Sequence, residues 1–399
     1  MANPNTTYHP LGDYIRPVDV RNRDLKVTKL LGLSIEKCFI PSIANTIGTD
    51  MSTYKIVQPR QFAYGPVTSR NGDKITIALY TGDEPAIISQ AYVVFEIMDA
   101  GVPVETHGRA SLPDAPSQLL PEYLMMWFRR PEFDRYARYH SHGSAREIFD
   151  WDEMCATKIP VPPIAEQRAI VAEYEAVQNR IMVAKRMIAT LQDTAQTLYR
   201  KTFVDGIDKE NLPEGWRWGT IKDYCKKITS GGTPNRGCDE YWNSNDYPWL
   251  KSGEVQNNVI VNIEEYISTK GLENSSAKLI PAGTVVMAMY GATAAQVAYL
   301  TCETTTNQAC CNMICNDKKE AAFLYFHLLF NQEEIKRLAN GGAQENLSQE
   351  LIAAQPIILF NDDKIIQPFE TILDNLVVCY KEIEKLTEIQ SLLLARMGR

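Results

Sequence analysis

The sequence contains no long apolar run and no segment that looks like an export signal. No stretch approaches the roughly 18 consecutive apolar residues of a membrane span, so no transmembrane helix is expected. The first ten residues have neither a basic segment nor an apolar core, so no signal peptide is expected. Nine cysteines, an odd number among 399 residues, do not form a disulfide framework. We therefore expect reduced thiols and a cytoplasmic location.

The densest group of cysteines lacks the Cys-x-x-Cys spacing that is typical of structural zinc sites. This group comprises Cys302, Cys310, Cys311 and Cys315, and His327 follows it. We expect these cysteines to be buried thiols within strands, and we predict no metal site.

Motifs for catalysis and for nucleotide binding are also missing. The only Pro-Pro pair, Pro162-Pro163, is followed by Ile164 and no aromatic residue, which excludes the catalytic tetrapeptide of DNA methyltransferases. No Gly-x-Gly-x-x-Gly opens a helix, and no Gly-x-x-x-x-Gly-Lys loop occurs. Ser230-Gly231-Gly232-Thr233-Pro234 has no clear helix after it, so we expect a turn there. No nucleophile or orienting group that would complete a catalytic set with His140 or His142 can be identified. The sequence predicts a binding protein without catalytic residues or a bound cofactor.

Two apolar ladders are the most informative feature that is present. Both advance by four and three residues in turn, which is the period of a coiled-coil seam. Each covers 33 residues, about 50 Å of α-helix or roughly fourteen base pairs of B-DNA. The first ladder consists of Ile170, Tyr174, Val177, Ile181, Ala184, Ile188, Leu191, Ala195, Leu198 and Thr202. The second consists of Ile365, Phe369, Ile372, Leu376, Cys379, Ile383, Leu386, Gln390, Leu393 and Met397.

A block of mixed strand and helix patterns precedes each ladder. In the first block, residues 74–80 and 91–97 alternate like strands, and residues 121–139 look helical. In the second block, residues 284–289 and 308–315 resemble strands, and residues 321–338 resemble a helix. We therefore predict four segments: a first head over 1–160, a long helix over 161–204, a second head over 205–358 and a second long helix over 359–399. Pro368 suggests that the last helix begins near that residue.

The order of these segments predicts how the helices run. Compact domains usually have their ends close together at the surface. The second head starts where the first long helix ends and leads into the second long helix. The second helix should therefore run back along the first. The predicted fold is mixed α+β (α/β), with two globular heads, two long antiparallel coiled-coil helices and pseudo-two-fold organisation.

The charge distribution argues against a continuous basic surface. The formal net charge of the chain is −8. Residues 1–163 carry 17 basic and 19 acidic side chains, and residues 205–355 carry 13 and 19. Only residues 164–204 are net basic, with 6 basic and 4 acidic side chains. If the protein binds DNA, it does so through local patches, and a partner supplies much of the charge that neutralises phosphates.

Several motifs resemble the DNA-specificity subunit of type I restriction–modification systems. The Pro-rich closure Ile159-Pro160-Val161-Pro162-Pro163 followed by Glu166-Gln167 is similar to the start of that family's central helix. Leu212-Pro213-Glu214-Gly215-Trp216, the Ser230–Pro234 turn and Tyr247-Pro248-Trp249-Leu250 look like the start of a second target-recognition domain, and residues 341–348 look like its end. Residues 21–25, 42–45 and 143–146 are similar to one class of first recognition domain. The second closure, residues 357–361, departs from the pattern because it lacks both the double proline and Glu-Gln.

The resemblance implies a non-catalytic subunit of a larger complex. Each head would read one half of a split, asymmetric target in double-stranded DNA, and the helices would fix the spacer between the halves. Two modification subunits would supply methylation with S-adenosylmethionine. Two restriction subunits would supply ATP-driven translocation and cleavage, with Mg²⁺. On the long helices, the outward residues Arg168, Glu173, Arg180, Lys185 and Arg186 are candidates for docking modification subunits; ordinary helix solubility is the alternative.

Candidate DNA contacts are polar residues in turn-like or basic segments. Arg and Lys suit guanine, Asn and Gln suit adenine, and hydroxyl groups suit phosphates. In the first head the candidates are Arg21, Asn22, Arg23, Lys26, Ser69, Arg70, Asn71, Arg138, His140 and Arg146. In the second head they are Ser230, Thr233, Arg236, Lys251, Ser252, Tyr290, Thr293, Gln296, Gln344 and Asn346.

Two other functions remain open from the sequence. One is a self-sufficient DNA-modifying enzyme whose site is not recognised; methylation or nicking by the purified chain would favour it. The other is a coiled-coil scaffold whose heads bind proteins, which the net acidity slightly favours. Gel shifts with random duplexes, with and without modification subunits, would separate the scaffold from a DNA-specificity subunit.

Overall fold

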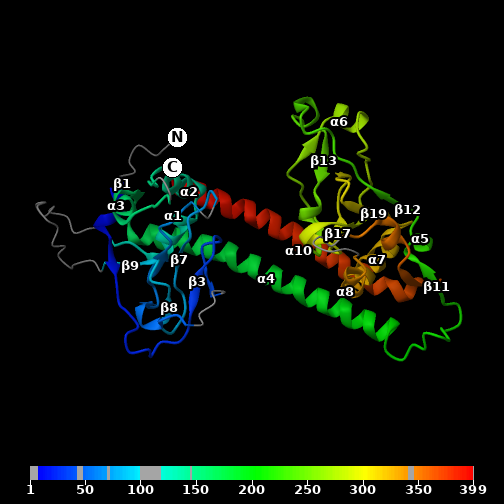
Figure 1. Cartoon of the computed structure of the whole chain (residues 1–399), viewed down its shortest axis with the longest axis horizontal. Coiled ribbons are helices and arrows are strands. Elements are labelled where there is room, and N and C mark those ends of the chain that lie inside the picture. Colours follow the sequence, from blue (N-terminus) through cyan, green and yellow to red (C-terminus); the bar gives the residue numbers. More distant parts are fainter. Residues whose placement is uncertain are drawn as a thin grey trace, which may run out of the picture. The chain divides into compact units, whose positions relative to one another are not determined.

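The computed structural model describes residues 8–42, 48–69, 72–98, 118–143, 146–339 and 346–398. The chain divides into two compact units: unit 1 contains residues 1–179 and 388–399, and unit 2 contains residues 180–387 (Figure 1). Two long helices, α4 (Ile164–Phe203) and α10 (Asp363–Arg396), contribute residues to both units. In the described ranges, every helix is too short or too polar to span a bilayer.

Unit 1 combines short strands with short helices. A four-stranded sheet has the order β2-β9-β6-β7, and the pairs β3-β4, β5-β8 and β1-β10 form separate ribbons. The aromatic core of this unit includes Phe62 and Phe95, which stack with ring centroids 4.9 Å apart. The strands are β1 (Tyr8–Pro10), β2 (Ile15–Val18), β3 (Leu31–Leu33), β4 (Phe39–Pro41), β5 (Lys55–Val57), β6 (Phe62–Tyr64), β7 (Ile77–Leu79), β8 (Ala86–Ile88), β9 (Val93–Ile97) and β10 (Lys158–Pro160). The helices are η1 (Leu11–Asp13), η2 (Met51–Thr53), α1 (Pro121–Arg129), α2 (Pro131–Tyr139) and α3 (Trp151–Ala156).

The helix predicted over 121–139 is two helices. Arg130, between α1 and α2, has φ −69° and ψ 136°, which is an extended conformation. Pro131 explains the break because proline lacks an N–H and disfavours helical geometry in the residue before it. The helix predicted over 321–338 is likewise divided, at Asn331, into α7 and α8.

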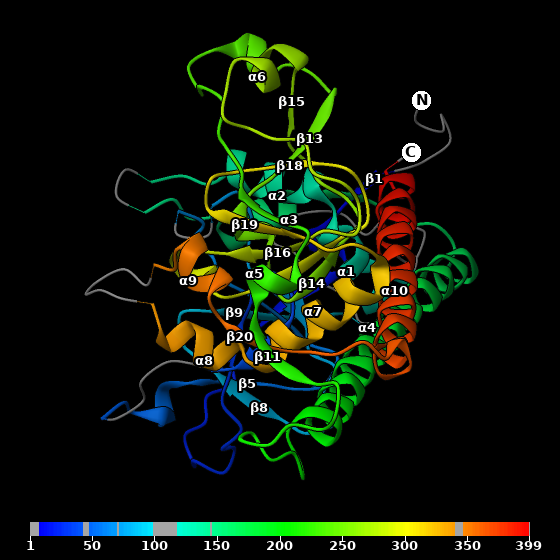
Figure 2. The same ribbon diagram turned by 90° about the vertical axis from the view of Figure 1, so that its right-hand side faces the viewer.

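Unit 2 is built on a five-stranded sheet with the order β12-β19-β16-β17-β14. A smaller sheet, β15-β13-β18, carries α6 in a lobe that stands away from α7 (Figure 2). The strands are β11 (Arg217–Thr220), β12 (Lys227–Ser230), β13 (Tyr247–Leu250), β14 (Asn258–Ile260), β15 (Tyr266–Ile267), β16 (Val285–Ala288), β17 (Val297–Leu300), β18 (Thr305–Thr306), β19 (Cys310–Ile314) and β20 (Pro356–Leu359). The helices are α5 (Ile221–Tyr224), η3 (Asp239–Tyr241), η4 (Ser252–Glu254), α6 (Thr269–Glu273), η5 (Gly291–Thr293), α7 (Lys318–Phe330), α8 (Gln332–Arg337) and α9 (Gln349–Ala353).

Each unit closes with the same device. In unit 1, β1 pairs antiparallel with β10, which leads directly into α4. In unit 2, β11 pairs antiparallel with β20, which leads into α10. A short helix, α3 or α9, precedes the closing strand in each case. The chain therefore enters and leaves each head through one two-stranded ribbon, as the argument from domain ends predicts.

The contacts of Gln167 give a structural reason for the glutamine of the Glu-Gln motif at the start of α4. The Gln167 side chain is fully buried. The Oε1 atom accepts from the backbone N–H of Leu120 at 2.9 Å, and the Nε2 atom donates to the carbonyls of Gln118 and Pro162, each at 2.8 Å. These bonds satisfy backbone groups on both sides of the helix start, so the glutamine ties α4 to the segment that precedes α1.

The two long helices pack antiparallel within each unit. In unit 2, Arg180 of α4 pairs with Glu382 of α10, while Thr194 and Leu198 line a groove with Gln367 and other residues near the start of α10. In unit 1, Glu173 lies 3.9 Å from Arg396, the last residue of α10. Every residue of both predicted ladders is buried or half-buried. The predicted antiparallel coiled-coil helices are thus confirmed.

The start of α10 differs from the prediction. The helix begins at Asp363, and Pro368 lies inside it. Proline removes the hydrogen bond that residue 368 would donate one turn back. Burial of Ile366 and Phe369 against the core of unit 2 holds the helix together across this position.

All nine cysteines are free. Cys310 and Cys311 are buried in β19, as predicted, whereas Cys302 and Cys315 are half-buried and lie outside the strands. Burial raises the pKa of the Cys310 thiol to about 12, which makes it a poor nucleophile at neutral pH.

Candidate functional site

In unit 2, most of the predicted contact residues belong to one set of connected loops. These loops are the segment after β12, η4 with Lys251, η5 with its flanks, and the segment before α9. The Thr293 hydroxyl donates to the Ser252 carbonyl at 3.0 Å, which joins η5 to η4. A backbone bridge joins Tyr290 to Asn346. The sequence separations of 41 and 56 residues show that the fold brings distant predicted positions together.

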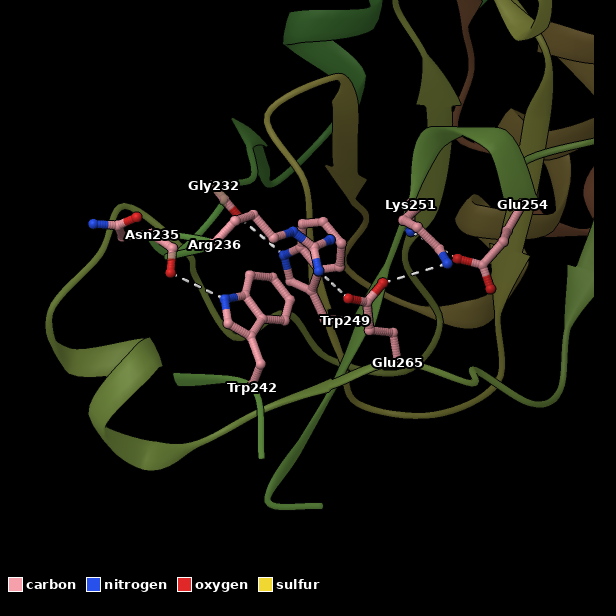
Figure 3. Close-up of polar contacts among 8 residues, drawn as sticks. All are labelled: Gly232, Asn235, Arg236, Trp242, Trp249, Lys251, Glu254 and Glu265. Carbon is pink, nitrogen blue, oxygen red and sulfur yellow. Dashed lines mark hydrogen bonds and ion pairs between the residues drawn. The ribbon is translucent and has the colours of Figure 1, made fainter. Parts of the chain in front are cut away.

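Arg236 lies at the centre of the best-defined cluster in these loops (Figure 3). Its guanidinium carbon is 3.6 Å from the ring centroid of Trp242 and 4.6 Å from that of Trp249. Its Nη1 atom pairs with the carboxylate of Glu265. Half of the arginine side chain remains exposed. An arginine packed against two indole rings is restrained while part of it stays open to solvent.

Lys251 shares the same carboxylate. Its Nζ atom lies 3.3 Å from Oε2 of Glu265, and its backbone N–H donates to the carboxylate of Glu254 at 2.9 Å. The pKa of Glu265 is lowered chiefly by its hydrogen bond from Arg236 and also by Lys251, against the opposing effect of burial. Glu265 therefore stays ionised at neutral pH and holds both cations.

The other predicted residues of unit 2 surround this cluster with different degrees of exposure. Tyr290 is 42% exposed. Thr233 pairs with Gln308, and the Ser230 carbonyl accepts from Lys278 at 3.4 Å. Gln296 is half-buried, and its backbone carbonyl accepts from Ala288 at 2.9 Å. Asn346 is exposed. Hydroxyl, amide and phenol groups thus accompany the charged residues on these loops.

In unit 1, one predicted group forms a loop next to β5. Asn22 is only 1% exposed; its side chain donates to the carbonyl of Val27 at 2.9 Å and accepts from the N–H of Val27 at 3.2 Å. Arg21 donates to the Thr53 carbonyl at 2.8 Å and pairs with Asp19. Asn22 therefore closes the loop, which presents Arg23 and Lys26 to solvent. Lys26 pairs with Asp24 at 2.9 Å.

A second group in unit 1 gathers at the end of α2. Arg138 pairs with Glu147, and Nδ1 of His140 is 3.1 Å from Glu153. The Thr68 hydroxyl donates to that of Ser141 at 2.9 Å, which places the exposed Ser69 beside the same region. Arg146, two residues before the bridge between Ile148 and His142, is also exposed. These loops form a second polar surface, and Arg70, Asn71 and Gln344 lie outside the described residues.

Sequence reasoning missed Trp242 and Glu265 and used Trp249 only as part of a family motif. The Trp242 and Trp249 indoles meet edge to face, with centroids 4.9 Å apart and an interplanar angle of 85°. Only the tertiary structure brings these two rings together beside Arg236. The density of tryptophans, two within eight residues, is the one signal in the sequence that marks this segment.

Comparison with known proteins shows a family likeness in the second half of the chain. Residues 213–393 match the family described as "Type I restriction modification DNA specificity domain". The HindI specificity subunit of Haemophilus influenzae is 30% identical over 207 residues, which cover 49% of this chain and 44% of that protein. The EcoR124I/EcoR124II specificity subunit of Escherichia coli is 24% identical over 234 residues, which cover 55% and 57%. The chain spans about half the length of these curated relatives.

A solved structure extends the likeness of fold to the complete chain. The type I restriction–modification S subunit from M. genitalium superposes with a TM-score of 0.58 at 13% sequence identity, covering 100% of this chain and 98% of that one. Its fold is shared by both units and both long helices of the present protein. The likeness to the type I restriction modification DNA specificity domain thus covers residues 213–393, and the likeness of fold covers both units.

Proposed function

We propose that this chain is the DNA-reading subunit of a type I restriction–modification complex. Each unit reads one half of a split, asymmetric sequence in double-stranded DNA. The chain itself performs no chemistry. The observation that carries the proposal is that the domain with the family match has its polar loop residues joined into one partly exposed surface around Arg236 and Lys251.

The surface chemistry supports DNA reading. The loops of unit 2 offer guanidinium, ammonium, amide and hydroxyl groups, which are the groups that contact base edges and phosphates. The end of α2 in unit 1 offers Arg138, His140 and Arg146 in a comparable setting. The net charge of −8 leaves the chain without a general attraction for DNA. Partner subunits would then supply most of the non-specific affinity.

The long helices suit the role of a scaffold for those partners. Arg168, Glu173, Arg180, Lys185 and Arg186 are all exposed on α4. Two modification subunits would dock there and bring S-adenosylmethionine. Two restriction subunits would add ATP- and Mg²⁺-dependent translocation and cleavage. A complex that guards cellular DNA against phage would act in the cytoplasm.

Sequencing of methylated bases in the host genome tests the proposal. With the gene intact, we expect methylated adenines in a single bipartite, asymmetric motif. Deletion of the gene should remove the methylation at that motif, and complementation should restore it. A genome whose methylation is unchanged by the deletion would refute the proposed function. Gel shifts of random duplexes with the chain and its modification subunits provide the matching binding measurement.

A further inference from the structure

The setting of Arg236 differs from that of an ordinary surface arginine. Its guanidinium carbon packs into the corner between two indole rings that meet edge to face, 3.6 Å from the centroid of Trp242 and 4.6 Å from that of Trp249. A free surface arginine samples many rotamers and loses that freedom when it binds. The two indoles restrict it before any ligand arrives. An arginine restrained in this way is suited to contacts that require one orientation.

The indole rings are themselves held by the loop that carries Arg236. The Nε1 atom of Trp242 donates to the carbonyl of Asn235 at 3.1 Å, and the Nε1 atom of Trp249 donates to the carbonyl of Gly232 at 2.9 Å (Figure 3). Trp249 is 2% exposed and belongs to β13. The loop, the two rings and the arginine therefore form one cluster of mutual contacts, which is anchored in the smaller sheet.

The charges of this cluster do not favour a phosphate clamp. Arg236 and Lys251 are matched by the carboxylates of Glu265 and Glu254, so the four side chains carry no net charge. Phosphate binding depends on surplus positive charge, and this cluster has none. A carboxylate beside the guanidinium would also repel a phosphate. The arrangement instead favours a neutral ligand that is recognised by directed hydrogen bonds.

The geometry leaves one edge of the guanidinium for such a ligand. Nη1 is occupied by Glu265, whereas the described part of the chain contains no hydrogen-bond partner for Nε or Nη2. Two parallel N–H groups on one planar edge match the O6 and N7 acceptors of guanine, which is the commonest specific contact of arginine in the major groove.

We propose that Arg236 reads a guanine in the half-site bound by unit 2, and that Trp242, Trp249 and Glu265 are positioning residues for it. This inference rests on the proposed function. Within that function it makes Arg236 a determinant of sequence specificity at one base pair, and it makes Glu265 the residue that fixes which edge of the guanidinium faces the DNA.

The test uses the complete complex of this chain with its modification subunits. The wild-type motif is first obtained from the methylated genome. Binding is then measured on a duplex that carries the motif and on duplexes in which each guanine–cytosine pair of one half-site is replaced in turn by adenine–thymine. We expect wild-type discrimination of roughly 5- to 150-fold at the position that Arg236 reads. Arg236→Lys keeps the charge but loses the planar fork, so discrimination should vanish at that position and persist at the others.

Matched variants separate positioning from simple folding. Trp242→Leu should weaken discrimination at the same base pair less than Arg236→Lys does, and Trp242→Phe should restore it because a phenyl face still stacks on the guanidinium. Lys270→Ala removes an ion pair with Glu240 in the same lobe without touching the cluster, and it should leave the motif unchanged. Recognition of the other half-site reports that each variant complex is folded.

Two results would overturn the inference without touching the proposed function. One is a wild-type motif that lacks guanine on both strands of one half-site, when that half-site is the one whose recognition changes in these variants. The other is an Arg236→Ala complex whose affinity falls equally for all duplexes while the motif stays intact, which is the behaviour of a phosphate contact. If the wild-type complex has no sequence preference at all, the proposed function itself fails.

Discussion

His327, in the core of unit 2, connects the packing of that unit to pH. Its ring is 4% exposed, and Nδ1 lies 2.7 Å from the Tyr199 hydroxyl of α4. Burial lowers the pKa of His327 to about 4. In the unfolded chain the imidazole takes up its proton near pH 6.5, whereas the folded chain resists protonation down to about pH 4. Below pH 6.5 the unfolded state therefore binds more protons, and stability falls as pH falls.

We expect unit 2 to lose about 3 kcal/mol of unfolding free energy between pH 6.5 and pH 4 from this residue alone. Urea denaturation over that range measures the loss. His327→Gln keeps a hydrogen-bonding partner for Tyr199 but cannot titrate. The variant should have a shallower pH dependence than the wild type, and equal slopes for the two proteins would contradict the assignment.

A buried ion pair holds unit 1 at the start of α2. The Nζ atom of Lys37 lies 2.8 Å from Asp134, and the two side chains are 6% and 12% exposed. Burial lowers the pKa of Lys37, while Asp134 opposes that shift. Asp134→Asn should destabilise unit 1 by roughly 3–5 kcal/mol because it leaves a buried cation without its counter-charge. Chemical denaturation of the full chain measures the change.

The control for this pair is a second substitution. Lys37→Met in the Asp134→Asn background removes the unpaired charge and keeps the N–H of Ile75 bonded to residue 134, which it contacts at 3.1 Å in the wild type. The double variant should recover most of the lost stability. If Asp134→Asn alone is neutral, the ion pair has no structural role.

Side-chain pairings of this kind could not be predicted from the sequence. The candidate residues Arg236 and Lys251 are visible as cations in a polar segment, but their shared partner Glu265 is 29 residues from Arg236. Nothing in local composition predicts that pairing, since it depends on how β13 and β15 align. The burial of Asn22 was missed for the same reason, because polar residues that bond their own loop look like exposed ones in sequence.

At the scale of elements, α10 contains an internal proline that can be tested. Pro368 lies five residues after the start of the helix and is exposed, so its ring fills no core position. Pro368→Ala restores a backbone donor and a good helix former. We expect the unfolding free energy of the chain to rise by roughly 1–2 kcal/mol. Ile366→Ala, at a buried neighbouring position, should lower it, which controls for general effects of alanine. A Pro368→Ala protein that is less stable than wild type would show that the proline is adapted to its site.

Periodic patterns predicted the elements better than breaks within them. Both ladders became continuous helices because heptad spacing reflects burial along a whole seam. Residues 121–139 and 321–338 each became two helices because a single residue, Arg130 before a proline or Asn331, leaves the helical conformation. A window that averages over a dozen residues cannot locate such a point. The strands predicted at 91–97 and 308–315 were found, shortened by one or two residues at most ends.

At the scale of the whole molecule, unit 1 brings Tyr8 and Gly398 together. The Tyr8 hydroxyl donates to the carbonyl of Gly398 at 3.3 Å. Residues 205 and 206 lie in an exposed turn after α4. A circular permutant that joins residue 399 to residue 1 through a short linker and opens near residue 205 should therefore fold and keep target recognition. The methylated motif of cells that carry the permutant measures this directly.

A second permutant provides the control. Opening the chain within α7, at a buried position such as Phe326, should abolish folding because it interrupts the core of unit 2. If the permutant opened near residue 205 is folded by circular dichroism but no longer recognises the motif, the proposed arrangement of heads and helices is wrong.

The paired ribbons β1–β10 and β11–β20 have a consequence for how such a protein can change. Each head joins its long helix through a single two-stranded ribbon. The residues between the two strands of that ribbon can therefore be replaced as a cassette. Thr220 and Pro356 face each other in the β11–β20 register. Crossovers near these two residues would exchange the head of unit 2, while unit 1 and both long helices keep their sequence. Under the proposed function, new target preferences would then arise by recombination of intact modules.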